Sequence, residues 1–308
     1  MNPEDPELKF FERHPMLVDI IAIFGCAASS LIIRQSDAPS VVLATWRLIC
    51  TVLLLSPVVW GKRTYRTELL TLPKRTVLMS AVSGIFLAIH FATWFESLKH
   101  TSIASSTVLV STEVVWVAIG YCVFLKGRLE GKAILAILVT MIGSALIAFS
   151  DSKSAGSNLY GDILALVAAV GIAAYTLLGR VVRTGTSTTV YTYIVYAFCA
   201  ATLGLITFVT GQPFTAGGWK TVLIGLILAL VCNILGHSAY SWCLKYFSPA
   251  FVSATKLCQP VVASVAAVFM FGEYPVAMQI IGGVIVIIGV IYYSVLEIRK
   301  NRSGIRNA

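Results

Sequence analysis

Ten apolar runs, each long enough to cross a lipid bilayer, follow one another along most of the chain. A helix needs roughly 20 residues to span a hydrocarbon core of about 30 Å, so each run predicts one transmembrane helix. Proline, glycine and charged residues separate the runs. The predicted spans are about 15–34, 38–60, 76–98, 101–125, 132–149, 159–179, 189–209, 220–244, 249–271 and 275–296. The sequence therefore predicts an all-α integral membrane protein.

The low content of charged residues supports the same class of protein. Only 12% of the 308 residues are charged and 57% are hydrophobic, whereas about 25% are charged in an average soluble domain. The formal net charge of +9 would suit a nucleic-acid partner. The basic residues lie in short breaks between apolar runs, however, so no soluble basic face exists and nucleic-acid binding is excluded.

The distribution of lysine and arginine predicts the orientation. With the N-terminus inside, 17 basic residues fall on the cytoplasmic side and 4 on the outer side, as the positive-inside rule requires. The outer residues are Arg34, Lys99, Lys153 and Lys220. We expect a multi-pass protein of the cell (inner) membrane with both termini in the cytoplasm.

The two halves of the chain share short motifs in the same order. Leu98–Ala104 recurs as Leu244–Ala250, and Asp19–Ala22 recurs as Asp162–Ala165. A chance match in apolar sequence is the alternative. Each half holds five spans, and an odd number inserts the second half upside down, as in many secondary transporters. The expected segments are a cytoplasmic N-terminal segment 1–14, a first five-helix repeat 15–150, a second repeat 151–298 and a basic cytoplasmic tail 299–308.

Several stretches resemble the EamA-type group of the drug/metabolite transporter superfamily. They are Ala38–Arg47, His90–Glu113 with Val123–Gly127, Gly161-Asp162, and Ser238–Pro260 with Phe269–Glu273. The resemblance implies ten helices in two inverted five-helix repeats, alternating access, and a central cavity lined mainly by spans 1, 3, 4, 6, 8 and 9. It also implies a small-molecule substrate: amino acids, nucleotide sugars, sugar phosphates or vitamins. One departure is Lys126-Gly127-Arg128, where members often have Gly-Glu, kept here only at Gly272-Glu273.

Four polar residues are expected at a similar depth, about 15–20 Å from the outer surface at 1.5 Å per helical residue. They are Glu113, Asn233, Lys256 and Gln259. Charged residues inside a bilayer usually face the bundle interior and a partner. One interpretation is a site for a zwitterion, with Lys256 binding an anionic group and Glu113 an ammonium. The other is that Glu113 and Lys256 only neutralise each other.

Further candidates come from aromatic, histidine and proline residues within the spans. Trp94, Trp116, Tyr175 and Tyr240 are candidates for the wall of a substrate site, or for packing and interface anchoring. His90 and His237 are candidates for a proton relay, or are bonded to neighbouring helices. Pro260 removes a helical hydrogen bond and predicts a hinge or a static kink.

Spans five and ten are poor in polar residues, and Gly282 and Gly289 lie one heptad apart. Small residues at this spacing suit lipid-facing or helix–helix contact, including a homodimer interface.

We predict a secondary transporter, most simply an exporter of amino acids or related metabolites, with nucleotide-sugar or phosphorylated metabolites as the alternative substrates. An intramembrane enzyme is disfavoured because HExxH, GxSxG, metal-ligand and phosphate-loop motifs are absent. No cofactor or metal is expected. A channel would favour rings of one polarity, whereas the midplane residues have mixed charges.

Overall fold

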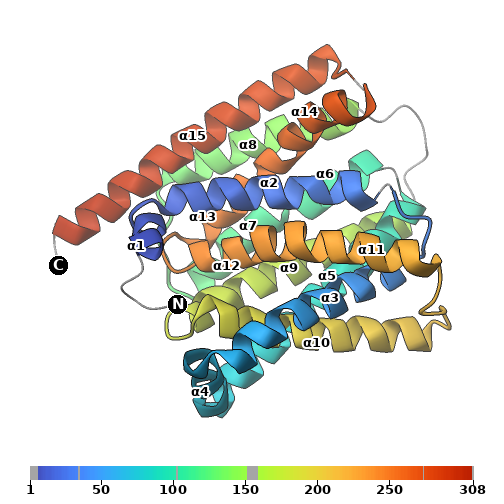
Figure 1. Cartoon of the computed structure of the whole chain (residues 1–308). Helices are drawn as coiled ribbons and strands as arrows, with labels where there is room; N and C mark the ends of the chain where they lie inside the picture. Colours follow the sequence, from blue (N-terminus) through green and yellow to red (C-terminus); the bar gives the residue numbers. More distant parts are fainter. Residues whose placement is uncertain (1–5, 34, 102, 151–158, 273, 307–308) are drawn as a thin grey trace.

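The computed structural model describes residues 6–33, 35–101, 103–150, 159–272 and 274–306, and within these ranges it contains helices and turns but no strand (Figure 1). The long helices run side by side in one bundle. The prediction of an all-helical membrane protein is confirmed.

Each of the ten predicted spans is helical. The first five are α2 (Pro15–Ile33), α3 (Ser40–Gly61), α5 (Lys74–His100), α6 with α7 (Ile103–Ser111 and Glu113–Val123) and α8 (Gly131–Ser150). The next three are α9 (Leu159–Arg183), α10 (Thr188–Val209), and α11, η1 and α12 together (Gly218–Leu228, Ala229–Ser238, Ala239–Cys243). The last two are α13, η2 and α14 together (Pro249–Thr255, Lys256–Cys258, Gln259–Phe271) and α15 (Ala277–Arg306).

Length and composition agree with this count. Among the described residues, nine helical stretches are long and apolar enough to cross a membrane, and the tenth span is apolar over Gly131–Ile147. Two further helices, α1 (Pro6–Arg13) and α4 (Arg63–Thr71), lie outside the predicted spans. No side chain of α4 is buried, which fits a connecting helix at the edge of the bundle.

Helix packing reproduces the internal repeat. In the first half α2 contacts η1 and α14, and in the second half the equivalent helix α9 contacts the equivalent elements α5 and α7. The second spans α3 and α10 contact each other, as do the fifth spans α8 and α15. In Figure 1, α2 begins beside α1 at the end of the bundle where α15 finishes, and α8 finishes at the opposite end. The two repeats therefore have opposite orientations, as five spans per repeat require.

Glycines bring α8 and α15 into backbone contact. A Cβ atom on Gly143 would lie 2.7 Å from the carbonyl oxygen of Gly282, and a Cβ atom on Gly282 would lie 2.7 Å from the carbonyl oxygen of Gly143. Gly289 lies against Thr140 of the same helix pair. The small residues predicted to suit helix contact are thus used within the chain. A homodimer through spans five and ten stays a prediction, and it would need another face of these helices.

Three spans are interrupted near their middles. The turn at Thr112 separates α6 from α7, and the 3₁₀ turn η2 separates α13 from α14 just before Pro260. Proline lacks an N–H and its ring clashes with the preceding turn, which accounts for the second break. In the eighth span, η1 is a π-helix of ten residues. All three interruptions carry residues of the candidate site.

Candidate functional site

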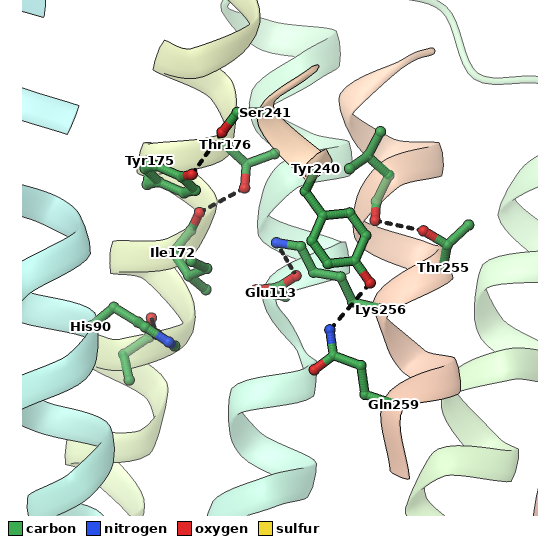
Figure 2. A network of polar contacts seen from close by, with 12 residues as sticks. His90, Glu113, Ile172, Tyr175, Thr176, Tyr240, Ser241, Thr255, Lys256 and Gln259 are labelled. Carbon is green, nitrogen blue, oxygen red and sulfur yellow. Dashed lines mark hydrogen bonds and ion pairs between the residues drawn. The ribbon is translucent and has the colours of Figure 1, made fainter. Parts of the chain in front are cut away.

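A buried ion pair joins the two repeats. The Lys256 Nζ atom lies 3.0 Å from Oε1 of Glu113, and the side chains are 13% and 9% exposed. Figure 2 shows Lys256 reaching from η2 toward Glu113 at the start of α7. Each residue stands beside a break in its span, where the backbone departs from the regular helix. The pairing is the one the midplane arrangement predicted, while binding of a substrate by these residues stays a prediction.

Tyr240 and Gln259 surround the lysine. The Lys256 ammonium lies 5.5 Å from the centre of the Tyr240 ring, close enough for a cation–π interaction. Gln259 donates from Nε2 to the Tyr240 hydroxyl at 3.3 Å (Figure 2). Tyr240 is 3% exposed. Four residues from spans four, eight and nine therefore form one contiguous polar group.

Asp19 of α2 belongs to the same region, although its position near the start of a predicted span did not mark it as a site residue. It is 2% exposed and accepts a hydrogen bond from Thr255 Oγ1 at 3.2 Å. Thr255 immediately precedes Lys256, so this carboxyl group lies on the lysine's side of the bundle. The equivalent residue of the second repeat, Asp162, accepts from Thr101 Oγ1 at 2.7 Å.

Asn233, which was expected at the same depth as Glu113 and Lys256, is bound by residues of the second span. Its Oδ1 accepts a hydrogen bond from Nε of Arg47 at 2.7 Å, and its Nδ2 donates to Thr51 Oγ1 at 2.7 Å. Both ends of the amide are therefore occupied by residues of α3. The structure does not bring Asn233 together with Glu113 and Lys256, because equal depth in the membrane says nothing about the direction in which a side chain points.

Arg47 is itself fully enclosed. It is 2% exposed, its guanidinium carbon lies 4.7 Å from the centre of the Phe91 ring, and its Nη1 lies 3.4 Å from Ser29 Oγ. Thus a second buried cation sits between α3, α5 and η1.

The π-helix η1 shapes this second region. π-helical segments are rare and often occur at functional sites. The Tyr196 hydroxyl donates to the backbone carbonyl of Asn233 at 3.1 Å, which supplies a partner within the widened turns. The close fit of α2 against η1 requires glycine: a Cβ atom on Gly25 would lie 2.8 Å from the Val231 carbonyl oxygen, and one on Gly236 would lie 2.6 Å from Cys26 Sγ.

The rings of both histidines contact the ring of Phe91. Their ring centres are 5.3 Å (His90) and 5.7 Å (His237) from that of Phe91. His90 Nδ1 lies 3.0 Å from the carbonyl oxygen of Ala168, so this nitrogen carries the proton and donates it. That bond to a neighbouring helix is the structural alternative that the sequence left open. A proton relay through the histidines stays a prediction.

The aromatic candidates divide into an inner and an outer group. The Trp94 ring stacks on His90 with centres 5.7 Å apart, and the Tyr175 hydroxyl lies 2.9 Å from Ser241 Oγ. Trp116 is instead 42% exposed, in a stripe of α7 with Ile119 and Val123, which are 51% and 64% exposed. The structure therefore places Trp116 on the outer surface of the bundle and not with the site. The stripe repeats at a helical spacing and is centred about a quarter turn around the helix from Glu113.

These features define a class of protein. Two inverted five-helix repeats around a buried layer of charged side chains are the architecture of a secondary transporter. The chain belongs to the EamA-like transporter family, whose profile matches residues 15–149 and again residues 159–295. The twofold match agrees with the repeat seen in the helix packing, and the protein is a multi-pass membrane transporter of this family.

Individual relatives are distant. The chain is 28% identical over 205 residues to an uncharacterized transporter of Clostridium kluyveri, covering 64% of this chain and 66% of that one. It is 25% identical to the uncharacterized transporter YxxF of Bacillus subtilis, covering 93% and 91%. It is 23% identical to the pseudopaline exporter CntI of Pseudomonas aeruginosa, covering 91% and 95%. A solved crystal structure superposes with a TM-score of 0.76 at 16% identity, covering 92% of this chain and 98% of that one, which supports the fold alone.

Proposed function

We propose that the protein exports a small zwitterionic metabolite, such as an amino acid or a related compound, by alternating access. The observation that carries this proposal is the buried Glu113–Lys256 ion pair between the broken fourth and ninth spans. A zwitterion carries one positive and one negative group, so it can bind Glu113 and Lys256 in place of their bond to each other.

The pair serves both states of such a carrier. Without substrate, Glu113 and Lys256 neutralise each other, so neither of these two charges is unpaired while the empty carrier changes orientation. With substrate, Glu113 binds the ammonium group and Lys256 the carboxylate. Tyr240 and Gln259, which already touch each other beside the lysine, supply a ring face and neutral hydrogen bonds.

The helix breaks explain how the carrier moves. The half-helices on either side of Thr112 and of η2 are not joined by continuous helical hydrogen bonding, so each half is free to tilt with less resistance than an unbroken helix. Substrate binding at the breaks therefore couples to opening on one side. Pro260 acts as the hinge in the ninth span.

The direction and location of transport follow from charge and relatedness. The excess of basic residues in alternate loops favours cytoplasmic termini in a cell membrane. The relative in Pseudomonas aeruginosa whose name describes it as an exporter matches over 91% of this chain, which favours export.

Counterflow in proteoliposomes is the test. The purified protein is expected to exchange labelled amino acids against an unlabelled gradient, and Glu113→Gln and Lys256→Met to abolish exchange. The double variant Glu113→Gln/Lys256→Met leaves neither member of the ion pair without its counter-charge, so it is expected to fold well yet remain inactive. Exchange at the normal rate in the double variant would mean that the pair is only structural.

A matched control exists at the surface. Lys220 Nζ also lies 3.0 Å from a carboxylate oxygen, on Asp37, but these side chains are 60% and 89% exposed. Exposed ion pairs contribute about 0–1 kcal/mol. Lys220→Met and Asp37→Asn are therefore expected to exchange substrate normally.

A further inference from the structure

Arg47 is a buried cation whose observed contacts are all neutral. They are the amide oxygen of Asn233 at 2.7 Å, the Ser29 hydroxyl at 3.4 Å and the face of the Phe91 ring at 4.7 Å. Its Nη2 atom has no hydrogen-bond partner among the described residues, although the residue is only 2% exposed. A buried guanidinium normally pairs with a carboxylate or phosphate, often through two nitrogens.

Two buried carboxyl groups, those of Glu113 and Asp19, lie near Lys256 and not at Arg47. Glu113 pairs directly with Lys256, and Asp19 accepts from Thr255, the residue next to Lys256. Asn233 accepts from Nε of Arg47 and Ser29 accepts from Nη1, which leaves Nη2 without an acceptor among the described residues. The side chain is thus fixed in direction but incompletely satisfied.

Two more buried side-chain nitrogens near the Phe91 ring lack hydrogen-bond partners in the described part of the chain. His237 Nδ1 and Trp94 Nε1 have no hydrogen-bond partner among the residues that the structure describes. The His237 ring contacts the same Phe91 ring as the guanidinium. Trp94 lies on α5 three residues after Phe91, and its ring stacks on that of His90, which also contacts the Phe91 ring.

The chemistry of these three groups specifies their missing partner. Arginine and the indole nitrogen only donate hydrogen bonds, and histidine is able to donate. Buried donors without acceptors are unfavourable, and a ligand with several acceptor oxygens and a negative charge removes the deficit of all three. The positive charges of both Arg47 and Lys256 act on His237 and on His90, so these four side chains share one region of the bundle.

We propose that Arg47, His237 and Trp94 form an anion subsite next to the Glu113–Lys256 pair. This inference rests on the proposed function and names the substrate class: an amino compound with two acidic groups. The ammonium binds Glu113, one acidic group binds Lys256, and the second, a carboxylate or a phosphate, binds Arg47. Asn233 positions the arginine and does not itself contact the substrate.

The test compares an acidic substrate with its uncharged isostere. In counterflow assays on the full-length protein, L-glutamate and O-phospho-L-serine are the acidic probes and L-glutamine is the neutral one. The wild-type protein is expected to prefer at least one acidic probe to glutamine by about tenfold or more, since a buried charge pair is lost with the amide. The acidic probe that is preferred identifies the second group as carboxylate or phosphate.

Variants assign the preference to the subsite. Arg47→Met is expected to slow exchange of the acidic probe more than exchange of glutamine, so that the preference falls to about one, and Arg47→Lys to retain part of the preference. Trp94→Phe keeps the ring and removes only the indole N–H, so it is expected to lower the preference by about two- to fivefold in a folded protein. The Trp94→Phe result stands even if Arg47→Met does not fold.

The outcomes separate this inference from the proposed function. If glutamine is exchanged in a Glu113-dependent manner but the wild-type protein shows no preference for either acidic probe, the anion subsite is wrong and the zwitterion site stands. An acidic preference that survives both Arg47→Met and Trp94→Phe also overturns the subsite. If no probe is exchanged, or exchange does not depend on Glu113, the proposed function itself fails.

Discussion

Glu113 and Gln259 occupy equivalent places in the two inverted repeats. They are 146 residues apart, as are Leu98 and Leu244 of the repeated motif, and each is the first residue after a break, Glu113 in α7 and Gln259 in α14. One is charged and the other is neutral. The backbone is therefore close to symmetric where the chemistry is not, and Lys256 complements only the first of the two. An asymmetric site of this kind suits a ligand with unlike ends.

Removing one member of the buried ion pair is expected to destabilise the protein more than removing both. Glu113→Gln leaves a buried ammonium without a counter-charge, which costs about 3–5 kcal/mol. The double variant Glu113→Gln/Lys256→Met is expected to recover most of that loss. Thermal unfolding in detergent would measure the three proteins. A double variant as unstable as the sum of the two single variants would argue against direct coupling.

Pro260 is expected to matter for turnover more than for stability. Pro260→Ala restores an N–H and lets the helix continue through η2, because the ring no longer clashes with the preceding turn. We expect an unchanged or higher unfolding temperature together with a several-fold slower exchange rate. Pro57 is the control, since it also lies inside a helix, α3, but in an uninterrupted span. Equal transport defects in Pro57→Ala and Pro260→Ala would make the Pro260 bend a static kink.

The sequence predicted the fold well because membrane constraints are strong and local. Span length, proline positions and alternating basic loops each depend on a few neighbouring residues, and all ten spans are found. The contact between Glu113 and Lys256 was also within reach, since two unlike charges at one depth in a bilayer have few other partners.

The sequence predicted how deep the site residues lie in the membrane, but not the direction in which each side chain points. Asn233 lies at the predicted depth but is held by Arg47 and Thr51. Trp116 lies only three residues from Glu113 in the same helix. The Glu113 carboxylate is nevertheless buried in the bundle, whereas the Trp116 ring is exposed on its outer surface. The π-helix that carries Asn233 and His237 has no recognised sequence motif. Its close contact with α2, where Gly236 packs against Cys26, is a tertiary property.

Membrane orientation is testable by labelling single cysteines. Thr184 and Thr215 are both exposed and lie in the connections before α10 and before α11. In a background without Cys122, the exposed native cysteine, Thr215→Cys is expected to react in intact cells with a membrane-impermeant maleimide. Thr184→Cys is expected to react only after the cells are opened, because its loop carries the inner positive charges. The reverse pattern would invert the topology and, with it, the assignment of export.

The ends of the fourth and ninth spans predict a stabilising substitution. Lys126 and Gly272 are again 146 residues apart, and both have a left-handed backbone, with φ values of 51° and 67°. After α7 the N–H of Gly127 bonds to the Tyr121 carbonyl oxygen at 2.9 Å, and after α14 the N–H of Gly272 bonds to the Val268 carbonyl oxygen at 3.1 Å. These are helix C-terminal motifs in which the left-handed residue is usually glycine.

Lysine in that conformation is strained by its Cβ atom, at a cost of roughly 1–2 kcal/mol. Glycine loses more conformational entropy on folding, so Lys126→Gly is expected to stabilise the protein by a net amount of about 0.5–1 kcal/mol. Gly272→Ala, which introduces the same strain at the equivalent position, is expected to destabilise it by about 1 kcal/mol. Unfolding temperatures in detergent would compare the two variants. A loss of stability in Lys126→Gly would mean that the lysine side chain contributes more through its own interactions than its backbone conformation costs.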